Sequence, residues 1–359
     1  MGTLFSCKKV ENSQSHKNNS NQNSVNRTLY NANENCTTTT TTTTTAYNNN
    51  NNNITANNNN NNNTANNNNN NNANINTNNK YFSNNEGKQN QPILTEKEQK
   101  MVNIANENKQ IVINKKYAIG TAEVIDDSRH SEIEIVLNDR GPSHHGTWVN
   151  VNDYSTIQTT IECHENDETK KICILNFADA FKPGGGYLNG RSPQEETLCR
   201  QTLLYPTLTN KNSWKLYSDN RSNKQNAIDH DTMIYSKDVY VIRDDSYELI
   251  DHPFQINIIS SAAVDNRKGN IENSQKIMER RIRKIIKLAA YEENDILILG
   301  AFGCGIFKND PKDISKIYRK ILIEEGMKDY FESVWIPVYK SERLFDIFSY
   351  GFPPRTKHH

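Results

Sequence analysis

The sequence contains three consecutive glycines at positions 184–186 and, after seven further residues, Gln194, Glu195 and Glu196. Consecutive glycines let a backbone approach a ligand closely and leave its N–H groups free to bind anionic oxygens. Two carboxylates at the mouth of such a loop can transfer protons or bind hydroxyl groups. The combination indicates a site that binds a phosphorylated sugar and breaks its glycosidic bond.

Glu195 and Glu196 are expected to have different roles in such a reaction. Cleavage of a glycosidic bond passes through an oxocarbenium-like state, and a carboxyl group kept protonated by a partly dry site can supply the departing hydroxyl with its proton. Most glycosidases place two carboxylates on opposite sides of the sugar, about 5 Å or more apart. Neighbouring residues of a helix point about 100° apart, which does not suit that opposed arrangement. The alternative, an ordinary acidic helix N-terminus, is disfavoured by the glycines directly before it.

A second glycine-rich segment, GAFGCGIFKNDP at residues 300–311, follows the apolar run at 296–299. Its glycines leave N–H groups that could bind a diphosphate, although neither loop contains a Walker or GxGxxG sequence. Ligands of open α/β sheets bind beyond the carboxyl ends of the central strands, so both loops are expected at one edge of the sheet. Cys304 has no evident base partner, which favours a packing role over that of a nucleophile.

Strand and helix patterns alternate between about residue 95 and residue 340. Alternation of this kind predicts a largely parallel or mixed sheet that is covered by helices on both faces. Asp310 and Pro311 predict a capped start for the last helix, and Thr95 predicts the N-cap of the first. Strands are predicted at 172–177, 239–242, 256–260, 296–299 and 334–338, and helices at 95–110, 194–204, 272–293 and 311–325.

The composition divides the chain at about residue 90. Residues 1–90 consist mainly of Asn and Thr tracts and are expected to be disordered, whereas residues 91–359 are expected to form one catalytic domain. Lysine plus arginine and aspartate plus glutamate each number 42, so no direct DNA binding is expected. The six cysteines show no CxxC or zinc spacing, which favours a reduced, intracellular and cytoplasmic protein. No apolar run approaches the length of a transmembrane helix.

The first residues match a lipidation pattern. Gly2 with Ser6 fits N-myristoylation, Cys7 could be palmitoylated, and Lys8 and Lys9 would add attraction to anionic lipids. Stable anchoring needs such a second signal beside one acyl chain. The sequence therefore predicts peripheral membrane association through Gly2 and Cys7, with residues 1–90 as a tether. An ordinary start to a disordered tail is the alternative.

The spacing of the glycines and glutamates resembles the signature of poly(ADP-ribose) glycohydrolases, in particular the microbial-type branch. Further segments match in the expected order: LCR at 198–200, IYSKDV at 234–239 and GAFGCGIFKNDP at 300–311. The resemblance covers about residues 95–350. It implies an α/β fold, a three-layer α/β/α macrodomain-like sandwich with a central mixed sheet that binds ADP-ribose.

The resemblance also implies the roles of individual residues. Glu196 would protonate the leaving ribose oxygen and then act as a base toward water, and Glu195 would hold the ribose hydroxyls. No cofactor and no metal ion would be required. The residues expected to bind the substrate are Asn176, Asp179, Gly184, Gly185, Gly186, Gln194, Gly303, Cys304, Gly305, Ile306 and Phe307.

The expected substrate is poly(ADP-ribose), cleaved from chain ends to release ADP-ribose, and ADP-ribosylated proteins are the expected partners. Two alternatives remain open. One is a non-catalytic ADP-ribose-binding macrodomain, against which the presence of both glutamates argues. The other is a hydrolase of mono-ADP-ribosylated proteins or of another ADP-ribose derivative. The sequence does not separate this alternative from the main prediction, because closure of the pocket around the terminal adenosine decides between them.

Overall fold

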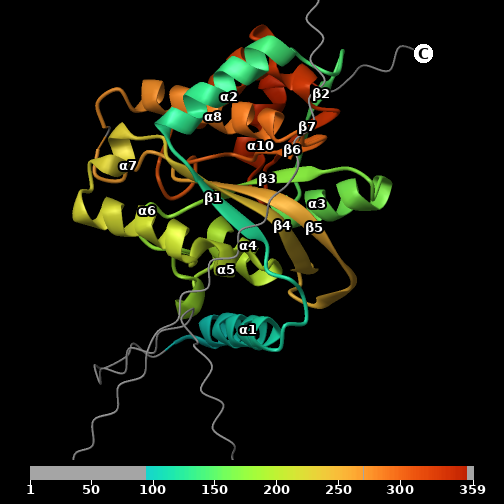
Figure 1. Cartoon of the computed structure of the whole chain (residues 1–359), viewed down its shortest axis with the longest axis vertical. Coiled ribbons are helices and arrows are strands. Elements are labelled where there is room, and N and C mark those ends of the chain that lie inside the picture. The colour runs from blue at the N-terminus through green and yellow to red at the C-terminus, as the bar shows by residue number, and fades with distance from the viewer. Residues whose placement is uncertain (1–93, 270, 354–359) are drawn as a thin grey trace, which may run out of the picture. The chain divides into compact units, whose positions relative to one another are not determined.

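The computed structural model describes residues 94–269 and 271–353, in which seven strands form one mixed sheet (Figure 1). The strand order is β1-β4-β5-β3-β6-β7-β2. β4 is antiparallel to both of its neighbours, whereas β5, β3, β6, β7 and β2 run parallel. This confirms the predicted mixed sheet. The strands are β1 (Thr121–Ile125), β2 (Trp148–Asn152), β3 (Ile172–Phe177), β4 (Met233–Arg243), β5 (Leu249–Ser261), β6 (Ile296–Ile298) and β7 (Ser333–Pro337).

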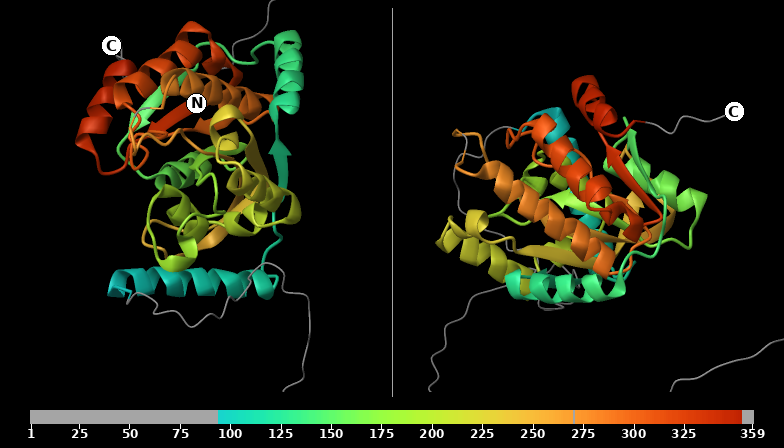
Figure 2. Two further views of the ribbon diagram at one scale, coloured as in Figure 1. Left: turned by 90° about the vertical axis from the view of Figure 1, so that its left-hand side faces the viewer. Right: turned by 90° about the horizontal axis from the view of Figure 1, so that it is seen from above.

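Helices cover both faces of the sheet (Figure 2). Successive side chains of a strand point to opposite faces, so Cys173 and Leu175 of β3 join one core while Ile172 and Ile174 join the other. The first core is closed by α2 (Asp127–Arg140), α8 (Ser274–Tyr291), α9 (Pro311–Arg319) and α10 (Glu342–Gly351). The second is closed by α1 (Glu96–Ile113), α3 (Thr156–Asn166), α4 (Gln194–Gln201), α5 (Leu204–Leu208) and α6 (Lys211–Ser222). The result is the expected three-layer α/β/α sandwich.

Two helix starts form as the sequence predicts. Thr95 caps α1 in a capping box, because its hydroxyl accepts from the Glu98 N–H and the Glu98 carboxylate accepts from the Thr95 N–H. Asp310 caps α9 and accepts from the Lys312 N–H at 2.8 Å, with Pro311 in the first turn. After Arg319 the chain continues as one π-helical segment, Lys320–Glu324.

The single helix predicted at 194–204 is wrong. α4 ends at Gln201, Thr202 takes an extended conformation, and α5 begins at Leu204. The Thr202 hydroxyl donates to the Leu198 carbonyl at 2.7 Å and accepts from the Leu204 N–H at 3.2 Å. The hydroxyl thus bonds to backbone groups on both sides of the break, a local competition with the helix that threonine offers readily.

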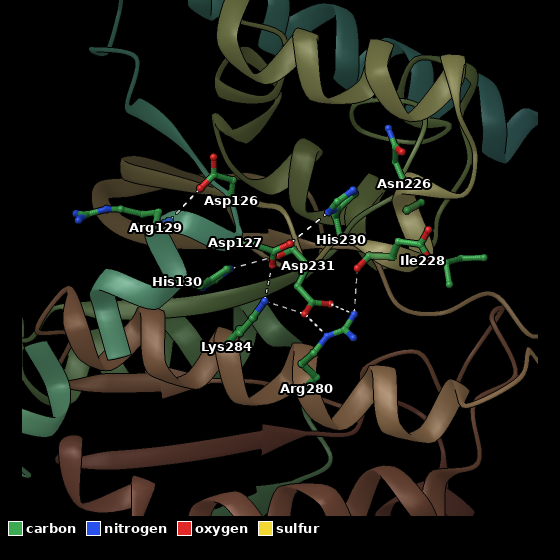
Figure 3. A network of polar contacts seen from close by, with 12 residues as sticks. Asp126, Asp127, Arg129, His130, Asn226, Ile228, His230, Asp231, Arg280 and Lys284 are labelled. Atoms are coloured by element: carbon green, nitrogen blue, oxygen red, sulfur yellow. Dashed lines mark hydrogen bonds and ion pairs between the residues drawn. The ribbon is translucent and has the colours of Figure 1, made fainter. Parts of the chain in front are cut away.

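A buried carboxylate, Asp231, joins α8 to the segment between α7 (Asn226–Asp229) and β4 (Figure 3). Asp231 is 1% exposed and contacts Arg280, Arg281 and Lys284, all on α8. Burial alone would raise the pKa of Asp231, but the hydrogen bond from Arg280 and the charges of Arg281 and Lys284 lower it below its ordinary value. Lys284 also pairs with Asp127 of α2, so three separate segments of the chain meet at these ion pairs.

Among the residues described, no helix is long and apolar enough to cross a membrane. The predicted tail, residues 1–90, and the lipidation residues Gly2 and Cys7 lie outside the part of the chain that the structure describes. The predicted division at residue 90 therefore stays a prediction.

Candidate active site

The two glycine-rich loops meet at one edge of the sheet, as predicted. They follow β3 and β6, which are paired in parallel, so both strands end on the same side. The rings of Phe177, before the first loop, and Phe302, in the second, lie with centroids 5.5 Å apart. A Cβ atom at Gly300 would lie 2.9 Å from the Phe177 ring, so only glycine allows this approach. The paired strands therefore place the two loops against each other.

Glu195 is buried beneath the first loop with both carboxylate oxygens occupied. Oε1 accepts from the Gly184 N–H at 3.2 Å and from Asn176 Nδ2 at 3.3 Å, and Oε2 accepts from the Asp179 N–H at 2.8 Å. Burial raises the pKa of Glu195 well above its ordinary value, and the charge of Glu196 acts in the same direction. The hydrogen bonds from Asp179 and Asn176 oppose this rise without reversing it.

Glu196 is also buried, at 7% exposure, and its carboxylate lies beside the first. Its Oε1 accepts from the Gly186 N–H at 2.8 Å. A Cβ atom at Gly185 would lie 2.6 Å from that oxygen and 3.2 Å from Oε2 of Glu195. The two carboxylates thus flank one glycine and do not face each other across a space for a sugar ring. This agrees with the expectation that they are not an opposed glycosidase pair.

Gln194 fixes the start of α4 against the end of β3. Its Oε1 accepts from the Phe177 N–H at 2.8 Å, and its Nε2 donates to the Leu175 carbonyl at 2.8 Å. The side-chain amide therefore pairs with the β3 backbone on both of its polar atoms. This contact brings the glutamates that follow Gln194 back to the mouth of the loop.

The other two polar residues expected to bind substrate lie in the same loop region. The Asp179 carboxylate accepts from the N–H groups of Phe181 at 2.7 Å and Lys182 at 3.0 Å, so it stabilises the turn of its own loop. Asn176 is fully buried, and its Nδ2 also donates to Ser260 Oγ at 3.0 Å. Within the described residues its Oδ1 has no hydrogen-bond partner, which leaves a buried acceptor at this edge of the sheet.

The second loop presents unpaired N–H groups. In the part of the chain described, the N–H groups of Gly305, Ile306 and Phe307 meet no hydrogen-bond acceptor. Gly303 has a left-handed φ of 74°, and a Cβ there would lie 2.6 Å from Nδ2 of Asn309. These features suit a loop that binds anionic oxygens through its backbone.

Cys304 and Asn309 have structural roles in this loop. Burial raises the pKa of the Cys304 thiol to about 12, so the thiolate needed for nucleophilic attack is not formed near neutral pH. The buried Asn309 donates from Nδ2 to the carbonyls of Val264 at 2.8 Å and Gly303 at 3.2 Å. Asn309 thereby ties this loop to the segment after β5, a role that its position in the sequence did not reveal.

Arg200 supports the start of α4, which carries Glu195 and Glu196, from behind. It is fully buried, and its guanidinium donates to the carbonyls of Met101 at 3.1 Å, Glu196 at 3.1 Å and Tyr187 at 2.9 Å. These carbonyls belong to α1, α4 and the 3-10 turn Tyr187–Asn189. α1 lies on the side of α4 and α5 that faces away from the sheet (Figure 2). In the sequence, Arg200 is named only within the matching segment at 198–200, and no role is predicted for it.

Within residues 94–269 and 271–353, no group of three or more His, Cys, Asp or Glu side chains could hold a metal ion. At this edge of the sheet lie two buried carboxylates, a glycine-rich turn between them and a neighbouring loop whose N–H groups at residues 305–307 meet no acceptor among the described residues.

Comparison with known proteins shows which family the fold belongs to. A family model described as "Microbial-type PARG, catalytic domain" (poly(ADP-ribose) glycohydrolase) matches residues 6–244. The glycohydrolase of Deinococcus radiodurans, solved with ADP-ribose, is 30% identical, with a TM-score of 0.59 over 65% of this chain and 94% of its own. The glycohydrolase of Thermomonospora curvata is 24% identical, with a TM-score of 0.63 over 71% of this chain and 100% of its own.

A search of curated proteins gave no match. The family model covers well over half of the chain, and the solved glycohydrolases share its fold. The chain therefore belongs to the microbial-type poly(ADP-ribose) glycohydrolase family.

Proposed function

We propose that the protein hydrolyses the ribose–ribose O-glycosidic bond of poly(ADP-ribose) from the chain end and releases ADP-ribose. The observation that carries the proposal is the pair of buried carboxylates that flanks Gly185 at the mouth of the first loop. The N–H groups of the second loop, at the adjoining strand end, would receive the diphosphate. The D. radiodurans enzyme, solved with ADP-ribose, supports the choice of ligand.

Glu196 serves as the general acid and base. Its carboxyl group gives a proton to the glycosidic oxygen, the bond from that oxygen to the anomeric carbon breaks, and the shortened polymer leaves with a hydroxyl group. The carboxylate then takes a proton from water while the water oxygen bonds to the oxocarbenium carbon. ADP-ribose forms, and the acid is restored.

The surroundings of the two glutamates support this division of roles. Both oxygens of Glu195 accept hydrogen bonds from the first loop, so this side chain is held rigidly and suits orientation of the ribose hydroxyls. Glu196 accepts one hydrogen bond, on Oε1, among the residues described. Its second oxygen is then available to the substrate.

The test compares wild type with Glu196→Gln and Glu195→Gln in the full-length chain. Each protein is incubated with purified poly(ADP-ribose), and free ADP-ribose and polymer length are followed over time. Glu196→Gln should bind ADP-ribose with near-normal affinity and lower turnover by about 10²- to 10⁴-fold, the range for losing a general acid. With wild type, free ADP-ribose should accumulate without oligomers of intermediate length.

Other results would redirect the proposal. Near-normal turnover by Glu196→Gln, with turnover lost in Glu195→Gln, would move the acid to Glu195. Early release of oligomers would replace the exo mode by an endo mode. Retained ADP-ribose binding with no release by wild type would refute the polymer hydrolase, and mono-ADP-ribosylated proteins would be tested next.

We infer in addition that the enzyme is cytoplasmic and tethered to a membrane by its N-terminus. Gly2 and Ser6 match the myristoylation pattern, and Cys7 and the two following lysines supply the second signal that stable anchoring requires. Wild type, Gly2→Ala and Cys7→Ser would be separated into membrane and soluble fractions. Membrane association of wild type alone supports the tether, and a wild type found only in the soluble fraction refutes it.

A further inference from the structure

We propose that Trp214 and Arg221 of α6 form a subsite for the adenosine and diphosphate of the polymer unit on the leaving side of the cleaved bond. The inference rests on the proposed function. The leaving hydroxyl in poly(ADP-ribose) belongs to the ribose of an adenosine, so a purine ring and a diphosphate follow directly after it. A subsite for this unit needs an aromatic surface and positive charge.

α6 packs directly on the loop that holds the catalytic carboxylates. Arg221 Nη1 donates to the Phe181 carbonyl at 2.6 Å, and Asn220 Nδ2 donates to the Ala180 carbonyl at 2.8 Å. The preceding loop residue, Asp179, donates its N–H to Glu195. α6 packs on the face of the sheet that carries α4, because Tyr217 of α6 and Leu198 of α4 belong to the same core (Figure 1). A leaving unit that runs over residues 180 and 181 would therefore meet α6.

Trp214 provides the aromatic surface. It is 49% exposed, and the guanidinium carbon of Arg221 lies 4.9 Å from the centroid of its ring. The two residues are seven positions apart on α6, so they lie on the same side of the helix two turns from each other. An exposed tryptophan beside an arginine can stack a base while the cation meets a phosphate.

The charge of this surface suits a diphosphate. Among residues 94–269 and 271–353, neither Lys182 nor Arg221 has a carboxylate within ion-pair distance, whereas Lys215 of α6 pairs with Asp219 at 2.6 Å. Lys182 follows the loop residue that Arg221 contacts. Two cations without an ion-pair partner among the described residues thus lie at the contact between the loop and α6, where they could meet the negative charges of the leaving unit.

The test uses Trp214→Ala and Trp214→Phe with two substrates. One is poly(ADP-ribose), and the other is ADP-ribose that carries a 4-nitrophenoxy group on the anomeric carbon, which releases 4-nitrophenol and lacks a leaving adenosine. Tyr350→Ala is the control, because Tyr350 is a 92% exposed aromatic residue on α10. Trp214→Ala should raise KM for the polymer about tenfold, the effect of losing one base–aromatic stack. Trp214→Phe should bring the KM for the polymer most of the way back to the wild-type value. Both variants should hydrolyse the aryl substrate at the wild-type level.

The outcomes separate this inference from the proposed function. Wild type that hydrolyses neither substrate refutes the proposed function itself. Wild type that hydrolyses both, with an unchanged polymer KM in Trp214→Ala, refutes the subsite alone. An equal loss on both substrates also refutes the subsite, because Trp214 would then act on the catalytic loop and not on the leaving polymer.

Discussion

Replacing Gly185 with alanine should inactivate the enzyme while leaving it folded. The new Cβ would lie 2.6 Å from Oε1 of Glu196, against the roughly 3.4 Å at which ordinary contact begins, so this carboxylate must retreat by about 0.8 Å. Oε2 of Glu195, which would lie 3.2 Å from the new Cβ, must also move slightly. A displacement of about 1 Å in a catalytic group costs on the order of 10² in rate, so turnover should fall about a hundredfold.

The backbone cost of this change can be separated by a matched variant. Gly185 has φ of 52°, and Gly326 has φ of 73° with no atom within 4 Å of the position that a Cβ would occupy. Alanine in this left-handed region costs about 1–2 kcal/mol, which lowers the melting temperature by about 2–8 °C in a domain of this size. Gly326→Ala should show this destabilisation with normal turnover.

The assay measures melting temperature and ADP-ribose release for wild type, Gly185→Ala and Gly326→Ala. We expect similar melting temperatures for the two variants and a fall in turnover of about a hundredfold in Gly185→Ala alone. If both variants release ADP-ribose at rates within about threefold of each other, the position of the Glu196 carboxylate beside Gly185 does not govern catalysis.

Two further predictions concern buried carboxylates. Asp231→Asn leaves Arg281 buried without its charge partner and should lower the free energy of unfolding by about 3–5 kcal/mol. Because folding lowers the pKa of Asp231, this difference should be constant from pH 8 to pH 5 and should shrink as the pH falls below the ordinary value of 3.8 toward the lower folded pKa. Urea unfolding across pH measures the difference, and a difference that shrinks near pH 7 would contradict the prediction. Glu195 should show the opposite pH dependence, because folding raises its pKa. The stability that the protonated Glu195 contributes to the fold is complete below the ordinary pKa of 4.5 and is lost as the pH rises toward the folded pKa. Glu195→Gln should therefore gain stability relative to wild type between pH 4.5 and pH 8, and a constant offset would exclude this linkage.

The sequence predicted the central elements of the fold because their pattern is unambiguous. The short continuous apolar run at 172–177 is typical of a strand buried on both faces, and it forms β3. The edge strands β1 and β2 were missed, because each is partly exposed and carries no continuous apolar run. α2 was missed as well, since Ile135 and Val136 are exposed while His130 is buried, which blurs its periodicity.

The site was predictable where function depends on local sequence. Three glycines and two glutamates lie close along the chain, and the structure brings them together in hydrogen bonds. The supporting residues were not predictable, because their partners are distant backbone carbonyls. Arg200 bonds to a carbonyl 99 positions away, and Asn309 to one 45 positions away. Backbone carbonyls leave no signature in residue type, so only the folded chain reveals these contacts.

The contact between α1 and Arg200 has a consequence for synthesis of the protein. α1 is made before the rest of the described fold. The side chains of its buried face are Met101, Ile104, Ala105 and Asn108. Part of what covers this face, however, lies about a hundred residues later in the chain. At about 5–20 residues per second, this interval lasts about 5–20 s, during which the face of α1 has no cover from α4. The support behind Glu195 and Glu196 therefore cannot form until α4 has left the ribosome, although the helix that provides part of it is complete well before.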